Sequence, residues 1–344
     1  MSKKRVLIGM SGGVDSTVST MMLLEQGYDV EGVYMKLHSK PGYHEIHMAR
    51  AQKAADHAGV KLHILDLQDK FKEDVYMPFI KIYEEGKTPN PCALCNRNIK
   101  FGAMVDFADS IGADYVATGH YIQTDGKNLI QAQDDTKDQS YFLFYINKDI
   151  LPRLLFPLGD KLKTDIKEIA ASIEGLESFA SQAESSEICF VETVYTDVLK
   201  KHIEVDVPGD VVDKEGNVIG THKGYMHYTI GKRRGFDVPS ALIPHYVTGI
   251  IPAKNQIVVG LKEELECFDV EIENLNMFST ETSFDTTVKL RYRTKAVACH
   301  VEIEMVDGIQ VGRIKLHESV PGVAAGQAAV FYDGAKLIGG GWIK

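Results

Sequence analysis

The feature that most constrains this chain is a glycine-rich turn between an apolar run and a helical pattern. The run VLI at residues 6–8 is followed by GMSGGVDSTVS at residues 9–19. Glycines let backbone N–H groups approach phosphate oxygens, and the helix that follows adds its N-terminal donors and positive dipole end. The stretch matches neither G-x-x-x-x-G-K-[ST] nor G-x-G-x-x-G. It predicts a phosphate-binding loop of another kind, in which Asp15 either orders the loop or bridges a magnesium ion.

Strands and helices alternate over the first part of the chain. Apolar, β-rich runs predict buried strands at 5–10, 30–35, 62–67 and 115–118. Helical spacing predicts helices at 16–26, 45–58 and 96–110, closely followed by Gly27, Gly59 and Gly112. This alternation indicates a parallel sheet covered on both faces, with ligands beyond the carboxyl ends of the strands. The loop at residues 9–16 lies at such an end.

The pattern changes near residue 203, where turn signals such as Pro208-Gly209 begin to separate short β-prone runs. After Cys267 the alternation is cleaner, with Asp333-Gly334 as a hairpin turn, which predicts a small closed barrel or sandwich. We therefore expect an α/β chain with three domains: a parallel-sheet domain at 1–197, a small central domain at 203–263 and a C-terminal β-barrel at 267–344.

Composition limits the class of protein. No apolar run approaches the roughly 18 residues of a membrane span, and no signal peptide is recognisable, so we expect a cytoplasmic protein with no membrane partner. The net charge of −10 gives no general attraction to nucleic acid. A local basic stretch can still bind it, and residues 225–234 interleave aromatic rings with Lys232, Arg233 and Arg234.

Thiols mark two further stretches. In KTPNPCALCNRNIKFG, at residues 87–102, Cys95 lies just before a helix expected to open near Asn96, beside Arg97 and Lys100. A thiol at a helix N-terminus near cations is expected to have a lowered pKa and to be more nucleophilic. In SSEICFVE, at residues 185–192, Cys189 has an apolar, strand-like context that by itself favours a buried structural thiol.

The sequence SGGVDS resembles the ATP-pyrophosphatase, or PP-loop, superfamily, whose parallel-sheet domain is adenine nucleotide α-hydrolase-like. The resemblance implies that ATP is cleaved between its α- and β-phosphates and that a substrate is adenylated. It does not identify that substrate.

Several further motifs together resemble the tRNA-specific 2-thiouridylases of the MnmA/TrmU type, and they cover the chain from end to end. They are PNPCALCNRNIKFG, GHY, KDQSYFLF, LLFPLG, EICF, YTIGKRRG, LRYR and AGQAAVFYDG. The resemblance implies the three domains named above and transfer of sulfur to C2 of the wobble uridine, position 34, of tRNA. It implies tRNA and a sulfur donor as partners, the donor being a cysteine desulfurase or a sulfur-relay protein.

The resemblance also implies roles for individual residues. Cys95 matches the nucleophile and Cys189 the cysteine that carries a persulfide, and the two are expected to form a transient disulfide. ATP, with Mg²⁺, is expected to be bound by Gly9, Met10, Ser11, Gly12, Gly13, Val14, Asp15, Ser16, Met35 and Gly119. The target base is expected at Asn90, Pro91 and Cys92, and the rest of the tRNA at His120, Lys137, Asp138, Gln139, Arg291, Tyr292 and Gln327.

Several alternatives remain at this point. Cys92 stands where many members of the family have an acid, so Cys92, Cys95 and Cys189 could instead hold a [4Fe–4S] cluster. A PP-loop ligase or amidotransferase that makes a small metabolite would leave these cysteines unused, and a non-enzymatic RNA-binding sulfur carrier would leave SGGVDS unused. His44 and His47, one helical turn apart, suggest a metal site, but the pattern favours a solvated helix face.

Overall fold

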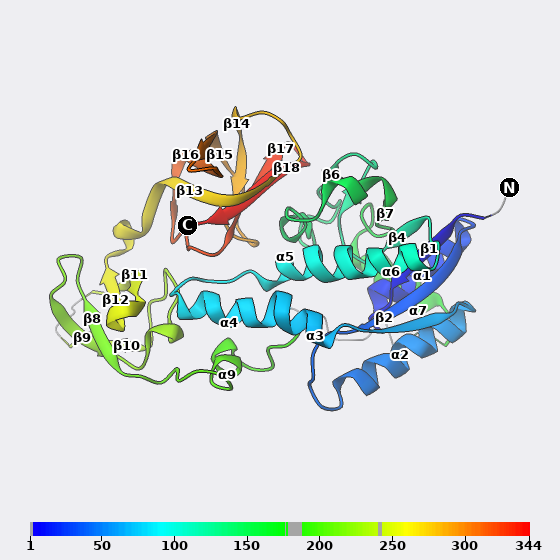
Figure 1. Ribbon diagram of the computed structural model, residues 1–344, viewed down its shortest axis with the longest axis horizontal. Coiled ribbons are helices and arrows are strands. Elements are labelled where there is room, and N and C mark those ends of the chain that lie inside the picture. Colours follow the sequence, from blue (N-terminus) through cyan, green and yellow to red (C-terminus); the bar gives the residue numbers. More distant parts are fainter. Residues whose placement is uncertain (1–2, 176, 178–187, 240–242) are drawn as a thin grey trace. The chain divides into compact units, whose positions relative to one another are not determined.

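The computed structural model describes residues 3–175, 177, 188–239 and 243–344 (Figure 1). The chain divides into two units. Unit 1 consists of Met1–Val75, Cys92–Ser186 and Asp333–Ile338, and unit 2 of Tyr76–Pro91, Glu187–Tyr332 and Gly339–Lys344. Three residues of the second thiol motif, Ser185, Ser186 and Glu187, lie outside the described residues.

A five-stranded parallel sheet in the order β3-β2-β1-β4-β7 organises unit 1 (Figure 1). Its strands are β1 Arg5–Gly9, β2 Asp29–Lys36, β3 Leu62–Asp66, β4 Tyr115–Ala117 and β7 Leu154–Leu155. The four strands predicted from the apolar runs and their parallel arrangement are confirmed. The central strand β1 is buried on both faces, which explains why its sequence is continuously apolar rather than alternating.

Helices pack on the sheet through small and branched apolar side chains. Val6 and Ile8 of β1 share one apolar cluster with side chains of α1, α2 and α7, while α6 packs against β4. The helices of this part of the chain are α1 Val14–Glu25, α2 Tyr43–Ala58, α3 Gln68–Phe71, α6 Met104–Ser110 and α7 Lys163–Ser172. Gly59 caps α2 in the left-handed conformation.

The helix that carries Cys95 begins earlier than its sequence pattern predicts. It is continuous from α5, Pro91–Cys95, through the π-helical segment η2, Asn96–Ala103, into α6. The expected start at Asn96 is wrong by five residues, because Pro91 occupies the first turn, where a missing N–H costs nothing. Cys95 therefore lies inside a helix rather than at its N-terminus.

Unit 2 contains a second sheet, in the order β10-β9-β8-β12-β11. Its strands are β8 Gly209–Val212, β9 Val218–His222, β10 Phe236–Asp237, β11 Tyr246–Ile251 and β12 Gln256–Gly260. The turn that joins β8 to β9 has Gly216 at φ +87°. Val211, Tyr228 and Val247 lie in its small core.

A closed antiparallel barrel follows, in the order β13-β16-β15-β14-β17-β18 with β13 also paired to β18 (Figure 1). Its strands are β13 Glu266–Met277, β14 Ser283–Lys289, β15 Val297–Val306, β16 Ile309–Pro321, β17 Ala328–Asp333 and β18 Lys336–Ile343. The predicted barrel is thus confirmed. Asp333-Gly334 forms the hairpin turn, with Gly334 at φ +57°.

The remaining elements are short, and a hairpin among them pairs with β18. They are η1 Lys72–Tyr76, α4 Met77–Glu84, β5 Gln123–Thr124, β6 Leu129–Ile130, η3 Ser140–Phe142, η4 Lys148–Arg153, α9 Tyr195–Leu199, η5 Tyr225–His227, η6 Pro252–Lys254 and η7 Lys262–Leu265. Within the described ranges, none of the helices has the length and apolar character that crossing a membrane would require.

Candidate active site

The glycine-rich loop joins the carboxyl end of β1 to α1, as predicted, and is held by its own hydroxyls. The Ser11 backbone N–H donates to Ser16 Oγ at 3.2 Å, and Ser16 Oγ donates to the Gly13 carbonyl at 3.1 Å. Thr17 Oγ1 donates to the same carbonyl at 2.9 Å. Gly13 is the N-cap of α1 and has no side-chain cap, so the first turn of the helix presents backbone donors to a ligand.

Gly12 and Gly119 allow close packing around this loop. Gly12 has φ +76°, and a Cβ there would lie 2.7 Å from the His47 carbonyl oxygen of α2. A Cβ on Gly119, just beyond β4, would lie 3.0 Å from the Asp15 carbonyl carbon. Met35, at the end of β2, is 3.6 Å from where a Cβ on Gly9 would be. The structure therefore brings together the residues predicted to bind ATP from three neighbouring strands.

Asp15 makes an ion pair that the sequence does not predict. Its Oδ1 accepts from Lys163 Nζ at 2.6 Å and from the Tyr121 hydroxyl at 2.9 Å. Lys163 is buried at the first position of α7, where the helix dipole disfavours a cation, so the pairing with Asp15 compensates an unfavourable placement. Of the two roles expected for Asp15, this contact favours loop ordering. Lys163 is 148 residues away in sequence, and no local pattern links the two.

The histidines near the loop are not a solvated face. His44 is buried, its Nδ1 lies 2.8 Å from the Tyr34 hydroxyl, and its Nε2 lies 2.6 Å from the His38 carbonyl oxygen. The expectation of a solvated face is wrong for His44, because α2 turns this residue toward β2. Desolvation lowers the pKa of the neighbouring His38 to about 4, which keeps that ring neutral near neutral pH.

Cys95 is buried in the Cys95 helix, and Cys92 is half-buried. Burial raises the pKa of the Cys95 thiol to about 11, and the positive charge of Lys100 offsets this only in part. Burial also raises the pKa of Cys92. The expected lowering of the Cys95 pKa is therefore wrong for this state, because desolvation outweighs the cation and the thiol is not at a helix N-terminus. Arg97, the second expected cation, instead lies over the Tyr145 ring, 4.3 Å from its centroid.

The segment 137–145, which contains KDQSYFLF, is hydrogen-bonded to the Cys95 helix. Asn96 Nδ2 donates to the Phe142 carbonyl at 3.0 Å, and Arg97 donates to the Tyr145 carbonyl at 2.6 Å. Asp138 is buried and accepts from the Ser140 hydroxyl at 2.7 Å, while Gln139 Oε1 accepts from the Tyr121 backbone N–H at 2.9 Å. Asp138 and Gln139 thus order this segment, and their contacts with tRNA stay predictions. Lys137 is half-buried at its start.

In unit 2, Cys189 is exposed on a turn. The adjacent Phe190 is buried, with its ring 5.1 Å from that of Phe79 and 5.3 Å from that of Tyr76. The strand-like, buried context expected for Cys189 is therefore wrong, because Phe190 provides the apolar anchor and leaves the thiol accessible. An accessible thiol is what a cysteine that receives sulfur from another protein requires.

The barrel holds the chain segment that leads into the Cys95 helix. Gln327 Nε2 donates to the Thr88 and Pro89 carbonyls at 3.1 and 3.0 Å, and the Thr88 N–H donates to the Ala325 carbonyl at 2.8 Å. Asn90, the next residue, is buried. The sequence predicts that Gln327 contacts tRNA, and the structure gives it this second, structural set of contacts.

Arg291 joins the barrel to the central sheet of unit 2. Its guanidinium donates to the Ile230 carbonyl at 3.2 Å and to the Gly322 carbonyl. Arg291 and its neighbour Tyr292 are half-buried, whereas Arg233 and Arg234 are exposed. The exposed arginines lie in the stretch whose aromatic and basic pattern favours a phosphate contact.

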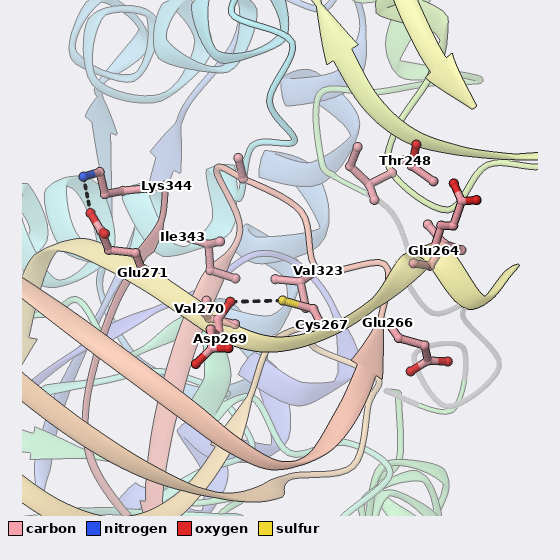
Figure 2. A pocket seen from close by; sticks show the side chains of 13 residues that line it. Thr248, Glu264, Glu266, Cys267, Asp269, Val270, Glu271, Val323, Ile343 and Lys344 are labelled. Carbon is pink, nitrogen blue, oxygen red and sulfur yellow. Dashed lines mark hydrogen bonds and ion pairs between the residues drawn. The ribbon is translucent and has the colours of Figure 1, made fainter. Parts of the chain in front are cut away.

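A pocket of about 330 Å³ in unit 2 lies beside β13 (Figure 2). Its labelled carboxylates are Glu264, Glu266, Asp269 and Glu271, the last of which pairs with Lys344. None of the predicted site residues lines it. Its acidic lining does not fit a nucleotide phosphate, and we assign it no part in the chemistry.

Among the described residues, no three His, Cys, Asp or Glu side chains are grouped so that they could hold a metal ion.

A parallel sheet whose first strand runs through SGGVDS into α1 defines a nucleotide-binding protein of the PP-loop class. The chain is 68% identical over its whole length to the tRNA-specific 2-thiouridylase MnmA of Sulfurimonas denitrificans, covering 99% of that protein. It is 55% identical to the protein of that name from a Nitratiruptor species, with both chains covered completely. The chain belongs to the family of tRNA-specific 2-thiouridylases.

Three family models match consecutive parts of the chain. A tRNA methyl transferase HUP domain matches residues 4–193, a tRNA methyl transferase PRC-barrel domain matches 196–261, and an aminomethyltransferase beta-barrel domain matches 269–343. The protein of Campylobacter concisus named tRNA-specific 2-thiouridylase MnmA is 52% identical, with 99% of each chain covered. The descriptions of the domain models name methyl transfer, whereas the names of the full-length relatives specify thiolation.

Proposed function

We propose that this chain forms 2-thiouridine at the wobble position of tRNA, using ATP and a sulfur atom carried on Cys189. The observation that carries the proposal is a PP-loop in the same chain as an exposed cysteine, Cys189, and a helix-borne thiol, Cys95. Methyl transfer requires no adenylated base, so the PP-loop favours thiolation. We propose that three domains contribute to this activity, at residues 1–197, 203–263 and 267–344.

The first step converts a poor leaving group into a good one. The uridine O2 attacks the α-phosphorus of ATP, pyrophosphate leaves, and the N3 proton is lost, which gives an O-adenylated base. Backbone donors at the start of α1 and the ordered Ser11–Ser16 loop hold the phosphates, with Lys163 fixing Asp15 beside them. Mg²⁺ is proposed to enter with the phosphates rather than on a site built by the protein.

The second step replaces oxygen by sulfur, and two routes remain open. In one, the Cys95 thiolate attacks the Cys189 persulfide, and the hydrosulfide that leaves adds to C2. In the other, the persulfide adds to C2 directly, and Cys95 then attacks the Cys189 sulfur. In both routes AMP departs, N3 regains a proton, and a Cys95–Cys189 disulfide forms, which a reductant must open before the next turnover.

The test is a reconstituted reaction with the whole chain. It contains unmodified tRNA, ATP, magnesium, cysteine and a cysteine desulfurase, because we propose such an enzyme or a sulfur-relay protein as the donor in the cytoplasm. We expect 2-thiouridine and AMP in equal amounts. AMP formed with a small metabolite and without thiolation would indicate the ligase alternative, and thiolation that requires bound iron would indicate the cluster alternative.

We expect Arg233 and Arg234 to contact the tRNA backbone. Arg233→Ala and Arg234→Ala should each weaken tRNA binding across sequences. Each should also reduce the slope of log affinity against log salt by about 1, because one phosphate is then no longer neutralised by the protein. Filter binding at several salt concentrations measures both quantities.

Arg313→Ala is the matched control, because it removes the same charge from β16, where the side chain pairs with Glu304 at 2.7 Å. Equal losses of affinity in all three variants would mean that net charge, not a contact at Arg233 or Arg234, controls binding.

A further inference from the structure

The π-helical segment η2 gives the Cys95 helix an unusual register. Hydrogen bonds between residues i and i+5 widen the turn, so residues five apart lie closer together around the helix axis than in an α-helix, and such segments occur often at functional sites. Gly102 makes this register feasible, because a Cβ there would lie only 2.9 Å from the Arg97 carbonyl oxygen, five residues earlier. Cys95 and Lys100 are also five residues apart. The segment therefore brings position 100 closer to the side of the helix that carries Cys95.

Lys100 is anchored on its far side by a buried histidine. Its Nζ lies 3.3 Å from His120 Nε2, and His120 Nδ1 lies 2.7 Å from Thr118 Oγ1. Burial lowers the pKa of His120 well below its usual value, so the ring is neutral and its Nε2 accepts a hydrogen bond from the Lys100 ammonium. This contact fixes the position of the lysine charge.

The Lys100 charge acts on both thiols of the helix. The positive charge of Lys100 lowers the pKa of both Cys95 and Cys92 and so opposes the effect of burial. Burial otherwise disfavours either thiolate. A nearby ammonium in a dry site is the direct way to stabilise a sulfur anion there.

We propose that Lys100 is a positioning residue that stabilises the Cys95 thiolate, with His120 holding its ammonium in place. The Cys95 thiol loses its proton to water, the sulfur keeps the electron pair beside the Lys100 ammonium, and no covalent bond to carbon changes. The value of this thiolate to the enzyme rests on the proposed function, because both routes of sulfur transfer require Cys95 as a nucleophile.

The test is the rate at which iodoacetamide alkylates Cys95, followed by mass spectrometry of the peptide that contains it. Rates are measured from about pH 6 to 11, without tRNA or ATP. In Lys100→Met we expect about a tenfold loss of rate at each pH below the inflection, because the Cys95 pKa, already about 11, rises by about one unit. Lys100→Arg, which keeps the charge, should restore most of the rate.

Arg97→Gln is the control on the same helix, because Arg97 contacts Tyr145 and should leave the profile unaltered. An unchanged profile in Lys100→Met, or an equal shift in Arg97→Gln, would overturn the proposal. A loss of rate in Lys100→Met that Lys100→Arg does not restore would also overturn it, because that result reports altered access to a buried thiol. Since no thiolation is measured, the result is independent of whether the proposed reaction occurs.

Discussion

Cys189→Ser is expected to abolish thiolation of tRNA while leaving ATP binding nearly intact. Removing the atom that carries sulfur should lower the rate by on the order of a thousandfold or more, because no other group replaces a covalent carrier. Serine is close to cysteine in size, and position 189 is an exposed turn anchored by Phe190, so the fold should not change. The measurements are 2-thiouridine formation, ATP affinity and the thermal transition.

Cys267→Ser provides the matched control for that substitution. Cys267 is partly exposed and its thiol donates to the Asp269 carbonyl at 3.1 Å in the pocket of Figure 2. The Cys267→Ser variant should thiolate tRNA at the normal rate. After incubation with the desulfurase, the intact protein should gain one sulfur atom in mass in Cys267→Ser but not in Cys189→Ser. Undiminished thiolation by Cys189→Ser would remove Cys189 from the mechanism.

Gly12→Ala is expected to destabilise the protein by about 2–4 kcal/mol. The positive φ of Gly12 strains any other residue, and the new Cβ would lie 2.7 Å from the His47 carbonyl oxygen and 2.9 Å from Arg50 Cβ, neither of which moves without shifting α2. Urea denaturation measures the loss. We also expect ATP binding to disappear, because the new Cβ displaces the loop and the first turn of α1 from the positions that present their backbone donors.

Gly13→Ala separates folding from phosphate binding at the neighbouring position. Gly13 has φ −101°, and a Cβ there meets only the Ser11 hydroxyl oxygen, at 3.4 Å. Stability should change by less than about 1 kcal/mol, while ATP affinity should fall by about tenfold or more, because the Cβ stands where phosphate oxygens approach the backbone. Normal ATP affinity in Gly13→Ala would place the phosphates elsewhere.

The parts of this structure that depend on nearby residues could be predicted from the sequence. β1, the loop and α1 lie within one stretch whose apolar, glycine and helical patterns are each local, and the Asp333-Gly334 turn is set by two residues. The barrel followed from alternation within short strands. These features needed no knowledge of which segments meet in space.

The surroundings of the reactive groups could not be predicted in this way. The pKa of Cys95 depends on burial by other segments, and the sequence showed only the cations beside it, one of which faces Tyr145. Lys163 reaches Asp15 across 148 residues, and the early helix start moved Cys95 from a helix end to a helix interior. Charge effects at a site depend on three-dimensional distance and solvent exclusion, neither of which is encoded by spacing.

The bond from Gln327 to the Thr88 carbonyl has a consequence for synthesis on the ribosome. The two residues are 239 positions apart, so at about 5–20 residues per second Thr88 waits roughly 10–50 s for its partner to be made. The PP-loop residues and both Cys95 and Cys189 are translated before Gln327. Strand β18, which closes the barrel, is made later still. A chain interrupted after Cys189 would therefore carry every reactive group but would lack the hydrogen bonds from Gln327 that hold the segment leading to Cys95.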